Sequence, residues 1–368
     1  MDFGHKMKRS ARISIHPEAL QHNLQQAKKA APQSKVNAVI KANAYGHGVL
    51  ETAGILYQQS DGFAVSCVPE AVELRQGNID KPITVLQGFQ TIDDLRIAEN
   101  YQLRLTLHDD FQLQLLDEYP GSYRFDLNLK VDTGMHRLGF SPTRAVDVFH
   151  RLKNHYQVNP KTLMLMTHLS CADEPKNSYT KQQLVTFQQV SEAIPVKKSI
   201  ANSAGILAWK ETHVDWIRPG IMLYGSSPFA ETHRDDLDLK AAMTLTAPII
   251  SIHYLKKGDC IGYAATYQCT KDINVAVVAC GYADGYPRHA STGTPVLING
   301  YEAKLLGRVS MDMIVVDIDD FPKGSVRVGD LVELWGKRLS VDVIAQKAET
   351  IAYELLCNAG NNCSINGT

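Results

Sequence analysis

The stretch Val36-Asn-Ala-Val-Ile-Lys41 is an apolar run that ends in a lysine, and similar runs return along the first two-thirds of the chain. Short apolar runs are typical of strands in a parallel sheet, because such strands are covered on both faces. Seven further candidate strands follow this one, at residues 62–65, 83–86, 104–107, 124–130, 162–168, 197–201 and 214–218.

Segments of helix length separate most of these runs, for example residues 91–99 and 141–154. Ser141 and Pro142 supply the N-cap and first-turn proline of the second one, and Pro17 opens a helix that runs to about residue 31. Eight strand–helix alternations in roughly 200 residues predict a parallel (β/α)8 barrel of the TIM type. An open, doubly wound sheet would want a G-x-G-x-x-G turn after its first strand, and the sequence has none there.

The pattern changes after about residue 240, where short strands dominate. They are predicted at residues 245–254, 273–279, 295–298, 303–306, 314–316 and 331–334, with a short helix at 341–347. Asn299-Gly300 is a type I′ hairpin signal. The predicted fold class is therefore α/β, with a TIM-like barrel over residues 1–240, including a short N-terminal strand, and a mainly β domain over residues 241–368.

Composition excludes several classes of protein. The chain has 44% apolar and 21% charged residues and a formal net charge of −1, so nothing points to nucleic acid as a partner. No apolar stretch reaches the 18 or so residues that span a bilayer, and the N-terminus lacks the apolar core of a signal peptide. We therefore expect a cytoplasmic protein. The seven cysteines form no C-x-x-C pair or Cys/His cluster, so we expect neither a disulfide framework nor a metal site.

Polar residues stand where several candidate strands end, and a barrel carries its chemistry at that end of its strands. Each is weak evidence alone, since such a lysine is usually solvated and Asn-Ser is usually a helix cap. Their joint placement at one end of the barrel favours a functional site. The residues are Lys41, Lys130, His168, Asn202, Ser203 and Arg218.

Two of these places predict specific chemistry. An amine held against an apolar wall, as at Lys41, loses proton affinity and becomes a competent Schiff-base nucleophile for an aldehyde cofactor. Arg218-Pro-Gly-Ile221 places a cation beside a glycine that lets backbone N–H groups approach an anion. Together with Ser203, this segment predicts a phosphate cradle.

At these residues the sequence resembles the alanine racemase family, which is pyridoxal-phosphate-dependent, and the likeness runs over nearly the whole chain. The segment 38–48, AVIKANAYGHG, resembles the family's cofactor-lysine signature. Further matches, in the expected order, are KVDTGMHRLG (130–139), TH (167–168), NSA (202–204), RPGI (218–221), GYAATY (262–267), GYADGY (281–286), VSMD (309–312) and IAYE (351–354).

The resemblance implies roles for the residues of the barrel. Lys41 would hold the cofactor, pyridoxal 5'-phosphate, and act as one catalytic base, while Arg218 would face the pyridine nitrogen. Arg137 would contact the cofactor's phenolic oxygen and the substrate carboxylate, with Lys130 beside it, a carbamate in many members. The remaining cofactor-binding residues would be Tyr45, His168, Asn202, Ser203, Gly220, Ile221 and Tyr353.

It also implies a homodimer with shared active sites. Tyr263 would be the second catalytic base and would reach the cofactor from the neighbouring subunit. Met311 and Asp312 would complete the substrate pocket from that subunit, and Tyr282 would narrow the entrance.

The chemistry of racemisation agrees with this set. A proton leaves Cα on one face and another returns on the opposite face, so two bases are the simple solution. Lysine and tyrosine have ordinary pKa values near 10, so both need help from their surroundings at neutral pH. An arginine at the pyridine nitrogen cannot readily protonate it, which leaves a weaker electron sink and restrains side reactions.

Other interpretations stay open. A decarboxylase of the same architecture should carry an acidic partner at the pyridine nitrogen, against which Arg218 argues. A broad-specificity racemase should resemble a secreted protein, and a non-catalytic cofactor-binding protein has no need of Tyr263. Whether the enzyme supplies D-alanine for peptidoglycan or degrades it is undecided, as is its substrate breadth. The sequence departs from the family at His136, where glycine is common, and in the tail 357–368.

Overall fold

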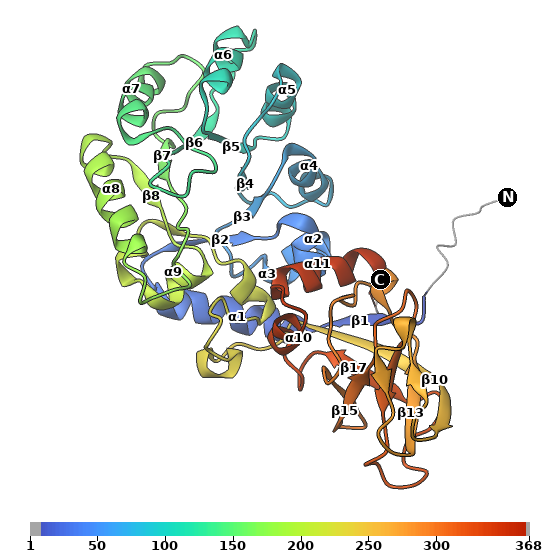
Figure 1. Ribbon diagram of the computed structural model, residues 1–368. Helices are drawn as coiled ribbons and strands as arrows, with labels where there is room; N and C mark the ends of the chain where they lie inside the picture. Colours follow the sequence, from blue (N-terminus) through green and yellow to red (C-terminus); the bar gives the residue numbers. More distant parts are fainter. Residues whose placement is uncertain (1–8, 366–368) are drawn as a thin grey trace, which may run out of the picture.

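The first two-thirds of the chain form eight parallel strands that close into a barrel in sequence order (Figure 1). The computed structural model describes residues 9–365, so the outer ends of the two predicted domains, residues 1–8 and 366–368, lie outside the described range. The barrel strands are β2 (Lys35–Val39), β3 (Gly62–Val65), β4 (Ile83–Val85), β5 (Arg104–Leu107), β6 (Asp126–Lys130), β7 (Met164–Met166), β8 (Lys197–Ser199) and β9 (Trp216–Ile217). The last strand closes on the first, with Trp216 opposite Lys35. The predicted TIM-like barrel is confirmed, and each strand overlaps one predicted run.

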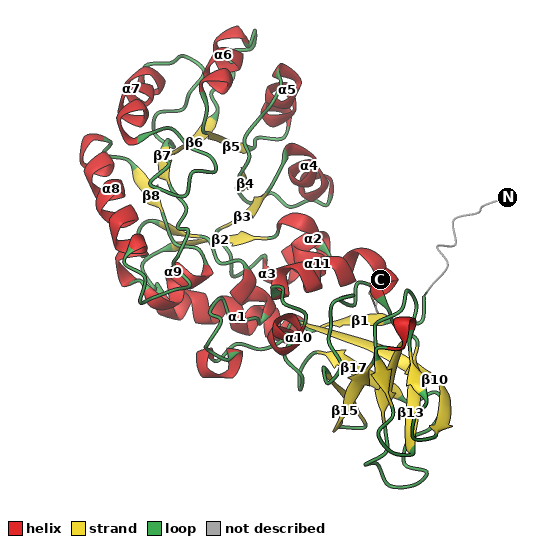
Figure 2. Cartoon of the chain, in the orientation of Figure 1, coloured by secondary structure: helices red, strands yellow, loops and turns green. Residues whose placement is uncertain are grey.

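Helices follow the barrel strands and cover the barrel from outside (Figure 2). Some of them begin at a side-chain cap: the Ser141 hydroxyl accepts a hydrogen bond from the Arg144 backbone N–H at 3.3 Å, as its predicted N-cap role requires. The helices are α1 (Pro17–Ala30), α2 (Lys41–Gly46), α3 (Val49–Leu56), α4 (Val68–Gln76), α5 (Ile92–Asn100), α6 (Asp110–Glu118), α7 (Pro142–Lys153), α8 (Tyr179–Ala193) and α9 (Ser203–Ala208), with short 3-10 turns η1 (Lys210–Thr212), η2 (Ile221–Tyr224) and η3 (Arg234–Leu237).

The rest of the chain is mainly β, as predicted. Together with β1, which precedes the barrel, it forms an eight-stranded sheet of the order β13-β16-β15-β14-β17-β10-β1-β18. The bounds are β1 (Arg12–Ile15), β10 (Met243–Leu255), β13 (Ile273–Val278), β14 (Pro295–Ile298), β15 (Tyr301–Leu306), β16 (Ile314–Asp317), β17 (Leu331–Trp335) and β18 (Ser364–Ile365), and a separate pair is β11 (Cys260–Ile261) with β12 (Tyr267–Gln268). Asn299 and Gly300 both have positive φ, 51° and 89°, which fits the predicted type I′ hairpin between β14 and β15.

Both ends of the described chain join this β-rich sheet. The strand β1 pairs antiparallel with β10 and parallel with β18. The division of the chain at residue 240 stays a prediction.

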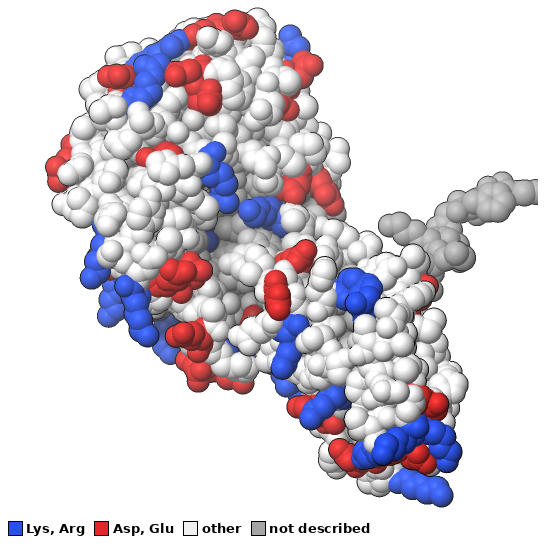
Figure 3. Space-filling model, in the orientation of Figure 1, with Lys and Arg blue, Asp and Glu red and all other residues white. Residues whose placement is uncertain are grey.

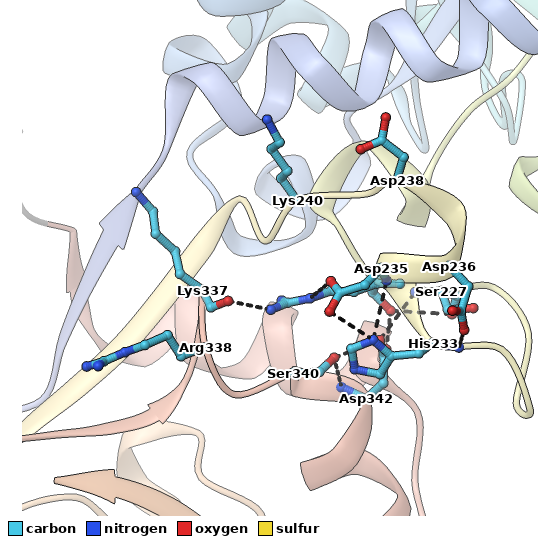
Figure 4. Close-up of polar contacts among 12 residues, drawn as sticks. Ser227, His233, Asp235, Asp236, Asp238, Lys240, Lys337, Arg338, Ser340 and Asp342 are labelled. Atoms are coloured by element: carbon cyan, nitrogen blue, oxygen red, sulfur yellow. Dashed lines mark hydrogen bonds and ion pairs between the residues drawn. The ribbon is translucent and has the colours of Figure 1, made fainter. Parts of the chain in front are cut away.

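Polar contacts tie the segment after the barrel to the segment after β17 (Figure 4). The buried guanidinium of Arg234 donates to the carbonyl oxygens of Gly336 at 2.8 Å and Lys337 at 2.7 Å. The Asp342 carboxylate accepts from the Ser340 hydroxyl and from the Ser227 backbone N–H. These contacts fix how the barrel and the β-rich sheet sit relative to one another.

Two helices precede the last strand, β18, and the sequence did not predict one of them. The helix α10 (Val341–Lys347) has the predicted bounds, but α11 (Ala352–Asn362) contains Gly360 and three asparagines, which are poor helix formers. This unpredicted helix packs closely against α2. Among the helices of residues 9–365, none is long and apolar enough to cross a membrane.

Candidate active site

A cavity of about 660 Å³ opens at the carboxyl ends of the barrel strands. Figure 3 shows the hollow, with basic side chains on the barrel side of its opening. The structure brings together around it every barrel residue that the sequence singled out, together with Tyr353 of α11, which the family resemblance also named. These lining residues are Lys41, Tyr45, Lys130, Arg137, His168, Asn202, Ser203, Arg218, Gly220, Ile221 and Tyr353.

The charges around the cavity have one sign. Lys41, Lys130, Arg137 and Arg218 line it, whereas none of the described residues that line it is Asp or Glu. These four cations repel one another, and a bound anion would offset the repulsion, since no carboxylate lines the described cavity. The cavity is therefore suited to a ligand that carries phosphate or carboxylate groups.

Lys41 reaches the cavity from an unusual turn. After the end of β2, the residues from Ala42 to Tyr45 all have φ of 52–53° and ψ of 39–54°, which makes one turn of left-handed helix. Such a conformation costs about 1–2 kcal/mol per non-glycine residue, so the surroundings must hold it. The turn places Lys41 and Tyr45 four residues apart on one face, and both side chains line the cavity.

Three side chains brace this turn from outside the cavity. The Glu70 carboxylate accepts from the backbone N–H of Ala42 at 2.8 Å and from that of Ser66 at 2.6 Å. The Asn43 side-chain oxygen accepts from the Val49 N–H at 2.8 Å. The buried His47 ring lies with Nδ1 3.0 Å from the carbonyl oxygen of Tyr45. Burial lowers the pKa of His47 to about 4, so the ring is neutral and Nδ1–H can donate to that oxygen.

The tyrosine of the turn is held between two other aromatic rings. Tyr45 stacks on Tyr224 at a centroid distance of 4.7 Å and lies 5.8 Å from the Tyr353 ring. Burial raises the pKa of Tyr45, and it raises that of Tyr353 to about 12. Both hydroxyls therefore stay protonated at neutral pH and can donate hydrogen bonds to an anion.

The lysines of the cavity have weakened proton affinity. Burial, and then the charge of Arg137, lowers the pKa of Lys41. Burial, followed by Arg218, Arg137 and Lys41, lowers the pKa of Lys130 to about 8. The pKa of His168 is well below its usual value, mainly through burial and then through Arg218, so its imidazole is neutral. A neutral amine fraction is what covalent chemistry at Lys41 requires.

Arg218 is fixed by its own hydrogen bonds. Only 4% of this residue is exposed, and its guanidinium donates to the Ser199 hydroxyl at 2.5 Å and to the Thr167 carbonyl oxygen at 2.6 Å. Burial lowers its pKa to about 10, so it remains a cation at neutral pH. The cavity wall thus carries a rigid, charged group without a carboxylate partner.

A cradle of small groups lies beside Arg218. The Ser203 hydroxyl accepts from the Gly220 N–H at 2.9 Å and from the Met222 N–H at 3.3 Å. A Cβ at position 220 would lie 2.9 Å from the Tyr45 hydroxyl, so only glycine leaves this approach open. Asn202 has the helix-cap role, since its oxygen accepts from the Gly205 N–H at 2.9 Å, and it also lines the cavity.

The remaining residues singled out from the sequence form a second group. Tyr263, Tyr282, Met311 and Asp312 belong to the β-rich part, and in the described range none of them lines the cavity. They are exposed: 65% for Tyr263, 40% for Tyr282 and 52% for Met311. One chain therefore holds the two sets of residues apart.

Comparison with known proteins identifies the relatives of this chain. The family model described as alanine racemase, N-terminal domain, matches residues 15–228, and the model for its C-terminal domain matches residues 242–365. This chain belongs to the alanine racemase family.

Relatives match over nearly their full length. The alanine racemase of Thioalkalivibrio sulfidiphilus (strain HL-EbGR7) is 46% identical over 360 residues, which cover 98% of this chain and 99% of that protein. Among solved structures, the biosynthetic alanine racemase from Pseudomonas aeruginosa superimposes with a TM-score of 0.94 at 41% identity, covering 97% and 99% of the two chains. The alanine racemase from Acinetobacter baumannii gives 0.92 at 36% identity, covering 98% and 100%.

The departure from the family pattern at His136 has a local explanation. This residue has φ of 54°, in the region that favours glycine. Its side chain is 79% exposed and its Nδ1 lies 3.0 Å from the Asp132 carboxylate. The ring is thus directed to solvent and Asp132, away from the alanine racemase cavity.

Sequence reasoning did not find some residues at this alanine racemase cavity. Ser66 and Gln87 line it just after β3 and β4, so the rule of strand ends applies to them as well. Cys357 lines it from α11 and Glu70 braces the lysine turn, and no sequence signal marked either.

Proposed function

We propose that this protein interconverts L-alanine and D-alanine with pyridoxal 5'-phosphate as its cofactor. The observation that carries the proposal is the cavity itself, because three other cations and no carboxylate line it beside the Lys41 amine, whose pKa is lowered. Membership of the alanine racemase family supports the substrate. The same interconversion serves both the supply of D-alanine for peptidoglycan and the degradation of D-alanine.

The residues present fit this cofactor. The amine of Lys41 would hold the aldehyde carbon, and the phosphate would lie in the cradle formed by Tyr45, Ser203, Gly220, Ile221 and Tyr353. The opening kept by Gly220 and the two protonated tyrosine hydroxyls support this placement. When bound, the cofactor supplies an electron sink for the carbanion at Cα.

Arg218 favours a racemase over a decarboxylase of the same architecture. We propose that it faces the pyridine nitrogen, where a group of pKa about 10 does not readily give up its proton. Its guanidinium is already committed to Ser199 and Thr167, which keeps it in place. Asn202 and neutral His168 would complete the polar wall around the ring.

Arg137 would bind the substrate carboxylate and the phenolic oxygen of the cofactor, with Lys130 as its supporting neighbour. Both side chains line the cavity, and the charge of Arg137 lowers the pKa of Lys130. This pairing would orient alanine so that its Cα lies between the two bases.

We propose a homodimer in which Tyr263 is the second base. Lys41 would exchange a proton with Cα on one face, and Tyr263 of the second copy would exchange one on the other, so that no proton is gained or lost. The exposure of Tyr263, Met311 and Asp312 supports this arrangement, because one chain leaves them outside its own cavity. Tyr282 would narrow the entrance.

The remaining expectations are part of the same proposal. We propose a cytoplasmic enzyme without metal, membrane or nucleic acid as a partner. Within residues 9–365, no group of three or more His, Cys, Asp or Glu is arranged to hold a metal ion. A non-catalytic cofactor carrier is less well supported, since family relatives extend over the β-rich part as well.

The test is racemisation by the purified protein. A panel of L-amino acids is incubated with protein and pyridoxal 5'-phosphate in heavy water, and both enantiomers and Cα deuterium are measured. We expect alanine to reach an equal mixture with deuterium at Cα, and Lys41→Ala to lose both signals. Unchanged L-alanine, or release of carbon dioxide from an amino acid, would overturn the proposal.

A further inference from the structure

Arg9 links the two loops that carry Tyr282, Met311 and Asp312. Its side chain donates through Nε to one oxygen of Asp284 and through Nη2 to the other at 3.1 Å. The same Nη2 donates to Oδ1 of Asp312 at 2.6 Å. Both carboxylates raise the pKa of Arg9, so it is always charged. The three residues are far apart in sequence, 275 and 303 positions from Arg9.

Asp284 is a fixed point in this network. It is 1% exposed, and its Oδ2 also accepts from the Gly281 backbone N–H at 2.9 Å. Asp284 therefore stabilises the turn η5 (Tyr282–Asp284), of which it is the last residue, and it also binds the Arg9 side chain. A buried carboxylate needs such hydrogen-bond partners to replace the water that it loses.

The loop that carries Met311 and Asp312 rests on this turn. The backbone N–H of Tyr282 donates to the Ser310 carbonyl oxygen at 3.1 Å, and that of Ala283 donates to the Met311 carbonyl oxygen at 2.9 Å. A Cβ at Gly281 would lie 2.4 Å from the Met311 oxygen, so the two backbones are in direct contact. The exposed Asp312 side chain adds a further link between the two loops, because it accepts a hydrogen bond from Arg9.

Arg9 is itself held in place. It stands three positions before Arg12, the first residue of β1, and β1 lies between β10 and β18 in the sheet. Because β1 is paired on both sides, the backbone that follows Arg9 is held in the sheet, which supports the guanidinium. Arg9 thus joins the turn η5 to the Met311–Asp312 loop.

We propose that Arg9 is a positioning residue for the alanine site of the second copy: it holds the Met311–Asp312 segment and neutralises the Asp312 carboxylate beside the substrate carboxylate. The inference rests on the proposed function, in which that segment completes the pocket. Two carboxylates close together repel each other, so an unpaired Asp312 would weaken alanine binding. Arg9 contributes both geometry and charge compensation without touching substrate or cofactor.

The experiment compares Arg9→Gln with Arg12→Gln in the holoenzyme. Arg12 is an exposed arginine three residues further on, which makes it a matched control. We expect Arg9→Gln to raise KM for both enantiomers roughly tenfold with kcat nearly unchanged, because the lost interaction acts on binding. Arg9→Lys keeps the charge and should recover part of the affinity. Calorimetric binding of propionate, which has the carboxylate and methyl groups of alanine, should weaken in parallel.

A double-mutant cycle separates the exposed contact with Asp312 from the pair with Asp284. Asp312→Asn removes only the exposed tie and leaves the pair with Asp284 intact. In that background, Arg9→Gln should raise KM less than it does in the wild type, because the two residues act together. Independent, multiplicative effects would overturn the inference.

The outcomes separate this inference from the function on which it rests. A wild type that racemises alanine, with Arg9→Gln equal to Arg12→Gln in KM and in propionate affinity, would overturn the inference alone. A wild type that does not racemise alanine would overturn both.

Discussion

Gly46 and Gly360 lie in direct backbone contact, since a Cβ built on Gly360 would come within 2.1 Å of the Gly46 Cα atom. One glycine ends the left-handed turn that presents Lys41, and the other lies in α11, which carries Tyr353. This contact therefore sets the position of Lys41 relative to Tyr353. It leaves no room for a side chain at either glycine.

Gly360→Ala tests this contact. Gly360 has no positive φ and lies inside a helix, where alanine alone would be favoured by up to about 1 kcal/mol. The clash with Gly46 should reverse the sign and destabilise the protein by about 1–3 kcal/mol, with weaker cofactor binding. The control is Gly54→Ala in α3, where a Cβ would meet nothing within 4 Å, and this variant should be slightly stabilised. Equal denaturation midpoints for the two variants would show that α11 moves aside freely.

Glu70→Gln tests the brace on the lysine turn. The amide can no longer accept from both Ala42 and Ser66, and loss of one such bond costs on the order of 1 kcal/mol. The Glu70 charge also raises the pKa of Lys41, so its removal should lower that pKa further. We expect Glu70→Gln to bind the cofactor less tightly. We also expect the pH profile for the rate of cofactor uptake by its apoprotein to shift to lower pH. Glu73→Gln, exposed on the same helix, should leave both unchanged, and a wild-type pH profile in Glu70→Gln would contradict the assignment.

The barrel was predictable from sequence because its strands are short apolar runs, and their ends carry the polar residues that meet at the cavity. The left-handed turn was not, because Ala42, Ala44 and Tyr45 have no intrinsic preference for positive φ and the turn depends on Glu70 and on packing. The helix α11 was not predicted, for a related reason. Gly360 reads as a helix breaker until its contact with Gly46 is known.

Lys130 should make stability depend on pH in a defined window. Its folded pKa of about 8 lies below the ordinary 10.5, so between these values the unfolded chain binds more protons than the folded one. Stability from this group therefore rises with pH across that window, and the cost of the buried charge is fully present below it. The apoprotein, freed of carbon dioxide, should gain free energy of unfolding relative to Lys130→Met as the pH rises from about 8 to about 10.5. A constant difference between the two proteins would contradict the lowered pKa.

The neutral amine of Lys130 should also react with carbon dioxide. Addition would give a carbamate and release one proton, and the new negative charge would lie among Lys41, Arg137 and Arg218, where no carboxylate lines the described cavity. With ¹³C-labelled bicarbonate, we expect a carbamate resonance in the wild type that is absent from Lys130→Met. Its absence from the wild type as well would leave Lys130 a free amine beside Arg137.

Shared active sites predict that two inactive variants restore each other. Lys41→Ala and Tyr263→Phe should each be inactive alone. A hybrid dimer has one site with neither group and one site with both. Random mixing of subunits makes half the dimers hybrid, so activity should recover to about a quarter of the wild-type value. Tyr301→Phe, which alters another exposed tyrosine of the β-rich part, should remain active and serves as the control. If differently tagged subunits are shown to form hybrids that stay inactive, Tyr263 does not act across the interface, and the second base must come from the same chain.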